Sequence, residues 1–398
     1  MRFSCYADNK YKKILTRQIS KSYCRSDVGI DCVKSGSFVV DVRTGGYGVF
    51  DESGELVKSS LTYRGKTAQF IPKDVNCSEY MDCDAVYIGN AYPHFGHFLL
   101  EHLNRAWCIG RIKSKKLKYV LIDNKNIGVK PWMIVFLKCL GIKEKDVLVL
   151  NKPMRFNNVF VPSQTLNIEA GWYASEFKNV FDIMKSNVKS KNVYEKIYVS
   201  RAKLPKDMRV YGEEKIQNIF EKNGFVVIYP ETMPLEQQIA VISRCKVLAG
   251  CAGTALHLSV MMDDGTRVIQ LKRTKSLKDN GEIQYRLCKL RDQDFDVVSA
   301  SVEEFKSVHG GVHAPQIIGF CDELLKFFDD NNFKYSSGDL VMPDRVLKQY
   351  RLQLDEFKKQ NGNRFYVWFK KTFIKYVSCF VPGRVMRSRF RRWLKEKM

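Results

Sequence analysis

Residues 196–271 alternate between short apolar runs and amphipathic segments; they read KIYVSRAKLPKDMRVYGEEKIQNIFEKNGFVVIYPETMPLEQQIAVISRCKVLAGCAGTALHLSVMMDDGTRVIQL. The apolar runs are typical of buried strands, and the amphipathic segments are typical of helices. We expect strands at 196–201, 225–230, 246–253 and 267–271, and helices at 213–224, 235–245 and 254–262. Strands and helices that alternate at this spacing predict a parallel, doubly wound sheet.

The rest of the chain predicts a second α/β unit with a β-rich start. SFVVDV (37–42) and YGVF (47–50) flank RTGG and predict a hairpin. Further strands are expected at 117–124, 146–150 and 158–162, with helices at 95–108, at 131–141 and within 314–360. A chain of 398 residues suits two cores, since domains are typically ~100–200 residues long. We expect an N-terminal acceptor-side domain at 1–185, a nucleotide-sugar-binding domain at 186–330, and C-terminal helices with a basic tail at 331–398.

The charge of the chain is strongly unbalanced. Lys and Arg number 66 against 43 Asp and Glu, a net charge of +23. This excess predicts an anionic partner, such as nucleic acid, a phosphorylated small molecule or a membrane surface. The amino terminus does not have the pattern of a signal peptide, and no run approaches the ~20 apolar residues that span a bilayer. The 12 cysteines contain no CxxC pair, which favours free thiols in a reducing cytoplasm.

Polar residues follow three of the predicted strands in the second half. They are Ser200-Arg201-Ala202-Lys203, Pro230-Glu231 and Gly250-Cys251-Ala252-Gly253-Thr254. Ligands of open parallel sheets bind beyond the carboxyl ends of the strands. A glycine turn at a helix amino terminus suits a phosphate, which Arg201 and Lys203 could also bind, and Glu231 could accept hydrogen bonds from ribose or sugar hydroxyls. The alternative is that Gly250 and Gly253 only permit tight packing between a strand and a helix.

The segment PHFGHFLLEHLNRAW, residues 93–107, carries a second group of polar side chains. A helix turns ~100° per residue, which places His94, His97, Glu101, Asn104 and Arg105 on one arc, opposite Phe95, Leu99, Leu103, Ala106 and Trp107. Three interpretations remain open for this arc. It is a solvated face, a metal site built from His94, His97 and Glu101, or a general base in which a carboxylate orients a histidine.

Taken together, these segments resemble glycosyltransferase family 61. The likeness lies in NAYPHFGHFLLEHLNRAW (90–107), KIYVSRAKLPKDMRVYGEEKI (196–216) and GFVVIYPETMPLEQQIAVISRCKVLAGCAGTALHLSVMM (224–262). The resemblance implies a GT-B-like α/β fold, with two Rossmann-like domains facing across a cleft. It also implies inverting transfer of a sugar from a nucleotide sugar without a bound metal. The family includes enzymes of bacterial capsular-polysaccharide biosynthesis.

The resemblance also assigns roles to particular residues. The family's histidine-plus-acid motif falls on His97 and Glu101, which implies a general base and the carboxylate that orients it. The implied donor-binding residues are Arg201, Lys203, Arg209, Glu231, Gly250, Gly253, Thr254 and Ala255, and the acceptor-side candidates are His94, Asn104 and Arg105. The chain departs from the family at two places. Cys251-Ala252-Gly253 stands where many members have Pro-His-Gly, and Gly212 precedes Glu213 where many have Asn.

The last residues form a basic, aromatic tail. Residues 364–398 carry eleven Lys or Arg and one acidic residue, interleaved with Phe and Trp. This pattern predicts an anchor on an anionic membrane surface, and the alternatives are a helix packed on the core or a nucleic-acid contact. We favour the membrane and expect no nucleic-acid partner, because no recognised nucleic-acid module is present.

The sequence therefore predicts a cytoplasmic glycosyltransferase at the inner face of the membrane. We expect a UDP-linked nucleotide-sugar donor, a glycan or lipid-linked glycan acceptor of capsule or O-antigen type, and no cofactor or metal. Two other functions remain open. One is a metal-dependent hydrolase that uses His94, His97 and Glu101, and the other is an inactive basic binding protein.

Overall fold

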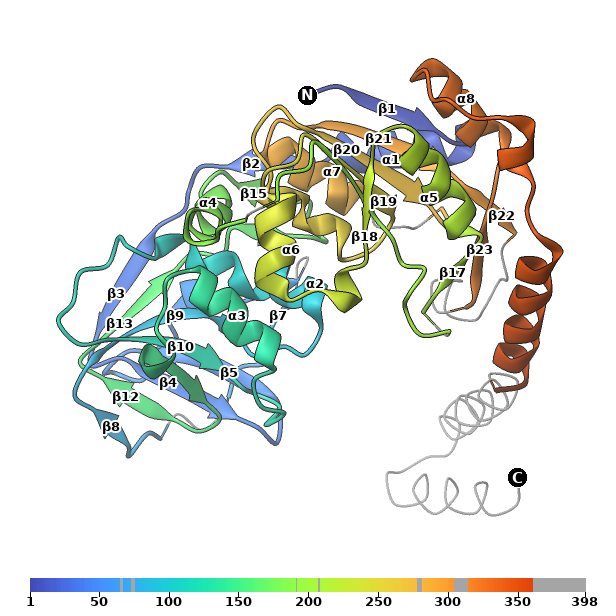
Figure 1. Ribbon diagram of the computed structural model, residues 1–398. Helices are drawn as coiled ribbons and strands as arrows, with labels where there is room; N and C mark the ends of the chain where they lie inside the picture. The colour runs from blue at the N-terminus through green and yellow to red at the C-terminus, as the bar shows by residue number, and fades with distance from the viewer. Residues whose placement is uncertain are drawn as a thin grey trace, which may run out of the picture.

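The computed structural model describes residues 1–64, 67–72, 76–190, 192–206, 208–277, 281–303 and 314–360. Two sheets with parallel strands form two lobes, and helices lie between the lobes and around them (Figure 1). The predicted α/β class is therefore confirmed. The basic tail at 364–398 lies outside the described residues, so its membrane role stays a prediction.

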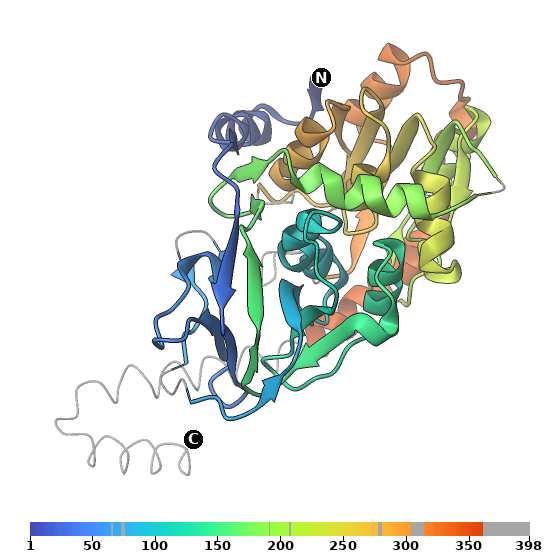
Figure 2. The ribbon, with the colours of Figure 1, turned by 90° about the vertical axis from the view of Figure 1, so that its left-hand side faces the viewer.

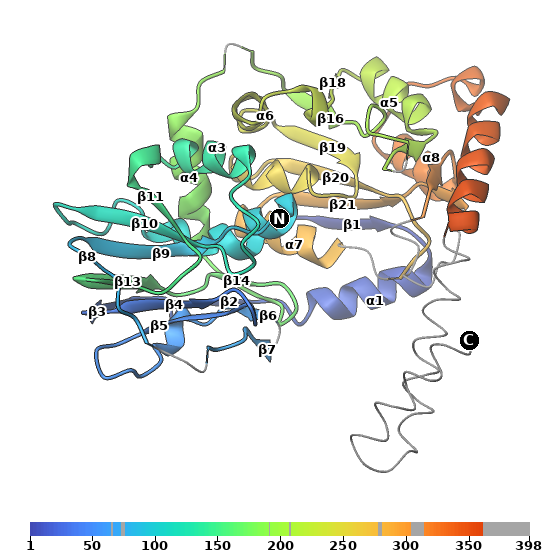
Figure 3. The same ribbon diagram turned by 90° about the horizontal axis from the view of Figure 1, so that it is seen from below.

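The second half of the chain forms a six-stranded parallel sheet, as the alternation of strands and helices predicts. Its strands are β16 (Lys196–Val199), β18 (Val226–Ile228), β19 (Val247–Cys251), β20 (Arg267–Lys272), β21 (Asp294–Ser299) and β1 (Phe3–Tyr6). They lie in the order β1-β21-β20-β19-β16-β18 (Figure 3). The first strand of the chain thus extends the sheet of the second half, where it pairs with β21.

Helices cover both faces of this sheet, so it is doubly wound. The helices are α1 (Asn9–Ile19), α6 (Leu235–Ile242) and α7 (Gly281–Leu290) on one face, and α5 (Glu213–Lys222) and α8 (Asp322–Asp330) on the other. Apolar side chains of each helix face the sheet: Leu15 and Ile239 are fully buried on one side, and Phe220 and Phe327 on the other. Within 314–360, where we expected one or two helices, residues 344–360 are also helical.

The first half forms a five-stranded sheet with one antiparallel edge strand. The strands are β9 (Asp84–Asn90), β10 (Leu117–Ile122), β11 (Val147–Leu150), β13 (Asn158–Pro162) and the antiparallel β3 (Ile30–Lys34), in the order β11-β10-β9-β13-β3. Helix α3 (Pro131–Cys139) packs against it within the large core. The predicted hairpin is present as β4 (Ser37–Asp41) and β5 (Gly46–Phe50). It forms a smaller sheet with β12 (Met154–Phe156) and β8 (Tyr80–Met81), and this sheet packs on the first through a second core.

Short elements complete the chain. The remaining strands are β2 (Tyr23–Arg25), β6 (Tyr63–Arg64), β7 (Thr67–Ala68), β14 (Leu166–Asn167), β15 (Trp172–Ala174), β17 (Val210–Tyr211), β22 (Ser301–Glu303) and β23 (Gln316–Ile318). The short 3₁₀ helices outside the candidate site are η1 (Lys58–Ser60), η4 (Glu144–Asp146) and η7 (Ser337–Leu340). In the described part of the chain, no helix combines the length and apolar character that crossing a bilayer requires.

Helix α4 (Phe177–Asn187) joins the two lobes (Figure 2). It packs against α3 of the first half and against the 3₁₀ helix η6 (Leu256–Met261) of the second. Phe177, Phe181 and Met184 are fully buried in a core that contains residues of both halves. The domain boundaries that we expected at 185 and 330 stay predictions.

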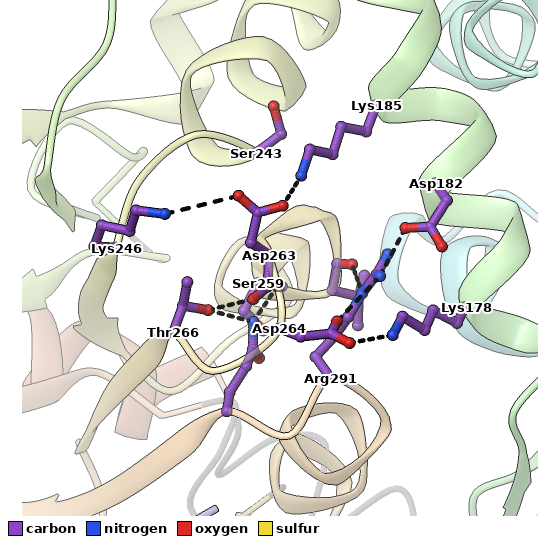
Figure 4. A network of polar contacts seen from close by, with 12 residues as sticks. Lys178, Asp182, Lys185, Ser243, Lys246, Ser259, Asp263, Asp264, Thr266 and Arg291 are labelled. Atoms are coloured by element: carbon purple, nitrogen blue, oxygen red, sulfur yellow. Dashed lines mark hydrogen bonds and ion pairs between the residues drawn. The ribbon is translucent and has the colours of Figure 1, made fainter.

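Ion pairs hold α4 to the turn that follows η6 (Figure 4). Lys185 pairs with Asp263, and Lys178 pairs with Asp264. The side chain of Arg291 is only 3% exposed, and its Nη1 lies 2.7 Å from a carboxylate oxygen of Asp182. A single exposed ion pair contributes little, but a network that includes a buried guanidinium holds its partners more firmly. The position of η6 is therefore coupled to α4.

Both large sheets have a point where their strand order reverses. In the second sheet, β18 lies on one side of β16 and the next strand, β19, lies on the other. In the first, β10 and β11 lie on one side of β9, and β13 lies on the other. Ligands of open parallel sheets bind at such points, beyond the carboxyl ends of the strands. Arg201 and the glycine turn follow β16 and β19, and His94 follows β9, so the predicted site residues lie at both reversal points.

Candidate active site

The segment after β9 is not the regular helix that we expected over 94–107. It begins as α2 (Phe95–His97), continues as the π-helix η2 (Phe98–His102), and ends as the 3₁₀ helix η3 (Leu103–Cys108). The angle per residue differs between these three types of helix, so a constant angle of ~100° does not hold along the segment. The predicted arc is consequently divided into two parts.

His97 and Glu101 lie in the first part and form a pair. His97 Nδ1 bonds to a carboxylate oxygen of Glu101, with the two side chains 29% and 11% exposed. The ring of Tyr92 meets the His97 ring edge-on at 5.5 Å between centroids. When Nδ1–H donates to the carboxylate, the lone pair of Nε2 is left to accept a proton. The pair therefore has the connectivity of an oriented general base.

His94 lies beside this pair and caps α2. Its Nδ1 accepts a hydrogen bond from the backbone N–H of His97 at 3.4 Å, and the two imidazole rings are 4.7 Å apart. Partial burial, followed by the nearby His97, lowers the pKa of His94. The hydrogen bond means that His94 helps to set the position of His97, and despite the partial burial much of His94 remains accessible from solvent.

Asn104 and Arg105 lie in the second part of the divided arc, and both are buried. The guanidinium of Arg105 donates to the backbone carbonyls of Ser59, Leu61 and Pro162. The side-chain amide of Asn104 donates to the carbonyls of Leu100 and Leu166. The change of winding after Glu101 turns both residues into the core, where they hold loops together. The expectation that they contact the acceptor is therefore corrected for this structure.

Arg201 lies at the reversal point of the second sheet, against the glycine turn. One Nη of Arg201 donates to the carbonyl of Met208 at 3.2 Å. A Cβ added to Gly253 would lie 2.9 Å from the other Nη, so a larger residue there would displace the guanidinium from its present position. The Nε–H of Arg201 is buried and has no hydrogen-bond partner among the described residues. A guanidinium whose Nε–H makes no other hydrogen bond is suited to bind an anionic group.

Three other predicted donor-binding residues follow β16 and β18. Lys203 Nζ lies 3.9 Å from the centroid of the Tyr229 ring, and Arg209 Nε donates to the carbonyl of Leu204 at 3.3 Å. Glu231 is exposed in the 3₁₀ helix η5 (Pro230–Thr232), just past β18. Both cations thus lie near Arg201 in the chain, and Glu231 lies at the end of the neighbouring strand.

The helix that we expected at 254–262 is shorter and wound differently. η6 spans only Leu256–Met261, and the carbonyls of Gly253, Thr254 and Ala255 accept its first bonds with 3₁₀ spacing. A short 3₁₀ helix has a much smaller dipole than a long α-helix. The expected helix at 254–262 is therefore corrected to a short 3₁₀ helix, and phosphate binding at 253–255 stays a prediction.

The contact between Gly96 and Thr254 brings the two groups of residues together. A Cβ added to Gly96 would lie 2.4 Å from Thr254 Cγ2 and 3.6 Å from His94 Cε1. His97 directly follows Gly96 in the chain, and Gly253 directly precedes Thr254. The Arg201 guanidinium packs against Gly253. The His97–Glu101 pair of the first half therefore lies near the glycine turn of the second half. We call this turn, residues 250–254 with the Arg201 guanidinium packed against it, the cationic turn.

Glu213 is a site residue that sequence reasoning missed. It is the first residue of α5, it is fully buried, and its carboxylate accepts from the Arg201 backbone N–H at 3.0 Å and from the Tyr198 hydroxyl at 3.2 Å. Burial raises the pKa of Glu213 from its ordinary value of 4.5 to about 7, although Cys251 and Arg201 oppose the shift. An acid with such a pKa beside a cationic turn is typical of functional sites. The only sequence signal was its place in the motif after the arginine.

This pKa gives a testable dependence of stability on pH. Between pH 4.5 and 7 the unfolded chain has released the Glu213 proton and the folded chain still holds it, so stability falls as pH rises through this window. The full change is about 3 kcal/mol. Glu213→Gln lacks this loss, and we expect its free energy of unfolding to rise relative to wild type by up to about 3 kcal/mol between pH 4.5 and 8. Urea unfolding across this range measures the difference, and a constant difference would contradict the assignment.

No metal-ligand cluster is formed in the described ranges. No three His, Cys, Asp or Glu side chains are placed there to hold one metal ion, so His94, His97 and Glu101 do not form a ligand set in this structure. A cavity of about 570 Å³ lies between α3, the end of α4 and α6, lined by residues that include Lys138, Asn187, Lys189, Glu236 and Gln237. None of the predicted catalytic or donor-binding residues lines that cavity.

An oriented histidine beside a cationic turn, at the reversal points of two α/β sheets, is typical of an enzyme that acts on an anionic substrate. Residues 95–269 match the model of the family described as Glycosyltransferase 61. On this match, together with the geometry of the site, the protein is a glycosyltransferase. The matched segment runs from α2 to β20 and includes His97, Arg201 and Gly253. No curated protein was found to match the chain.

Proposed function

We propose that the protein is an inverting, metal-independent glycosyltransferase that moves a sugar from a nucleotide-sugar donor to an acceptor hydroxyl. The observation that carries the proposal is the contact of Gly96 with Thr254, which brings the His97–Glu101 pair next to the Arg201 turn. A glycosyl transfer needs a base for the acceptor at one side of the anomeric carbon and a cationic site for the leaving group at the other.

His97 acts as the base in this proposal. Its Nε2 takes the proton of the acceptor hydroxyl while the hydroxyl oxygen forms a bond to the anomeric carbon. The bond between that carbon and the diphosphate breaks on the opposite face, and the configuration at the carbon inverts. Glu101 fixes the Nδ1–H tautomer and stabilises the imidazolium cation that forms.

The cationic turn stabilises the leaving nucleoside diphosphate. The Arg201 fork, with its buried Nε–H, binds phosphate oxygens, and Lys203 and Arg209 add positive charge. In this proposal, these cations supply the charge that a divalent metal provides in other glycosyltransferases. Glu231, at the end of the neighbouring strand, accepts hydrogen bonds from ribose or sugar hydroxyls.

Further features of the proposal rest on the sequence. The two sheets act as a GT-B pair, and closure of one half on the other completes the site. The donor is a UDP-sugar, and the acceptor is a lipid-linked glycan of capsule or O-antigen type. The enzyme works in the cytoplasm at the inner face of the cell membrane, where the basic residues 364–398 bind anionic lipid.

A panel of nucleoside diphosphates and nucleotide sugars tests the donor. We expect at least one UDP-linked compound to raise the melting temperature of the protein, because a ligand that binds only the folded state stabilises it. The same compound should be hydrolysed or transferred above background. Arg201→Gln should abolish the shift, and Arg244→Gln, which changes an exposed arginine outside the site, should keep it. The proposal is overturned if no nucleotide binds or reacts.

A further inference from the structure

Three hydrogen-bond donors converge on the buried carboxylate of Glu213. They are the backbone N–H of Arg201 at 3.0 Å, the hydroxyl of Tyr198 at 3.2 Å and the thiol of Cys251. Burial raises the pKa values of Tyr198 and Cys251 well above their ordinary values, so both stay protonated and able to donate. Glu213 therefore serves as a hydrogen-bond acceptor at the end of β16, where Arg201 begins the loop.

The backbone around Glu213 fixes where the carboxylate lies. Gly212, which precedes it, caps α5 in the left-handed conformation with φ of 82°. A Cβ on Gly212 would lie 2.2 Å from the carbonyl oxygen of Ile318, so the chain passes here only as glycine. The start of α5 is thus held against the strand β23, and the first side chain of the helix points at the end of β16.

The bond from Arg201 N–H to Glu213 sets the direction of the arginine side chain. A hydrogen bond to the amide fixes the orientation of the peptide plane, and the Cα–Cβ direction follows from that orientation. The Arg201 guanidinium packs closely against Gly253, so a rotation of the Arg201 peptide plane would move the guanidinium away from the glycine turn. Met208, whose carbonyl binds the tip of the side chain, lies seven residues away on the following loop.

We infer that Glu213 is a positioning residue, whose buried carboxylate holds the Arg201 backbone so that the guanidinium is aimed at the diphosphate of the donor. This inference rests on the proposed function, since it assumes that Arg201 binds that diphosphate. Glu213 does not touch the substrate and acts only through Arg201. A buried acid that lowers stability at neutral pH is retained for such a role at the cost of stability.

Two uncharged variants separate the hydrogen bond from the charge. Glu213→Gln keeps an acceptor oxygen for the Arg201 N–H, and Glu213→Met fills the same space with no acceptor. Both remove the negative charge, so any difference between them comes from the bond. We expect Glu213→Met to bind inorganic pyrophosphate and UDP about tenfold more weakly than Glu213→Gln, the loss of one hydrogen bond. Isothermal titration calorimetry measures both affinities.

Tyr198→Phe is the matched control, because it removes another donor to the same carboxylate and leaves the Arg201 bond in place. We expect its melting temperature to fall and its pyrophosphate affinity to stay within about threefold of wild type. If Glu213 only stabilises the fold, pyrophosphate affinity should fall in proportion to melting temperature in Glu213→Gln, Glu213→Met and Tyr198→Phe alike. That result would overturn the inference.

The remaining outcomes also decide the question. Equal pyrophosphate affinities of Glu213→Met and Glu213→Gln would overturn the inference and leave the proposed function standing. Should Glu213→Met not fold, Glu213→Asp supplies the comparison, because its shorter side chain keeps the charge and withdraws the acceptor from Arg201. Equal affinity of Glu213→Asp and wild type would then overturn it. A wild-type protein that binds neither pyrophosphate nor any nucleotide overturns the proposed function itself.

Discussion

His97→Gln abolishes most of the sugar transfer, with an expected loss of about 10²–10⁴-fold in kcat. Glutamine can still donate a hydrogen bond to Glu101, so the local structure is kept. It lacks a basic nitrogen, so the acceptor hydroxyl keeps its proton as it attacks. The measurement is the rate of sugar transfer with the donor that the nucleotide panel identifies, beside the melting temperature of each variant.

Two further variants sharpen this result. In His97→Ala, added imidazole should restore part of the transfer, because a free base can enter the space that the side chain leaves. His102→Gln is the matched control, since His102 lies on the same segment and stacks on Tyr92 at 5.0 Å between ring centroids. We expect a much smaller loss there. Near-normal transfer by a folded His97→Gln would remove His97 from the mechanism.

Sequence reasoning located the edge of the second sheet well. Arg201 and Gly253 are 52 positions apart in the chain, and they meet because parallel strands place their carboxyl ends at the same edge. Their direct contact also requires β16 to lie beside β19, and the sequence did not predict this strand order. The same argument extended to Glu231, which the structure places at the end of β18 but leaves exposed.

The errors have a common physical cause. The polar arc from His94 to Arg105 assumed constant winding, but tertiary packing selects π and 3₁₀ turns that local sequence does not reveal. Strand β1 has only four residues, and its partner strand β21 lies far away in the sequence, with Phe3 opposite Phe295. Glu213 has the same appearance in a sequence as any acid in the first turn of a helix. Its burial under Arg201 depends on the packing of α5 against β16.

Gly96→Ala tests the contact that joins the two halves of the site. The added methyl would lie 2.4 Å from Thr254 Cγ2, which is closer than carbon atoms approach, so Thr254 must shift or α2 and the glycine turn must move apart. A displacement of about 1 Å at a catalytic site can reduce the rate by about 100-fold, and we expect a loss of this size in kcat/KM. Gly96 has no positive φ, and alanine favours a helix over glycine. Any loss therefore reports on space and not on backbone strain.

Thr254→Ser should suppress the effect of Gly96→Ala, because serine lacks the methyl group that the new Cβ meets. The next atom of residue 254 lies 3.3 Å from that Cβ, a tight but tolerable contact. In the double variant we expect most of the lost kcat/KM to return, even if Thr254→Ser alone costs some activity. A double-mutant cycle expresses this recovery as a coupling between two residues 158 positions apart in the chain.

Gly29→Ala, where an added Cβ meets nothing within 4 Å, controls for the substitution itself. If Gly96→Ala is fully active, or if Thr254→Ser restores nothing, the His97 pair and the Arg201 turn do not act at one site. The proposed mechanism would then need a different base or a different donor position.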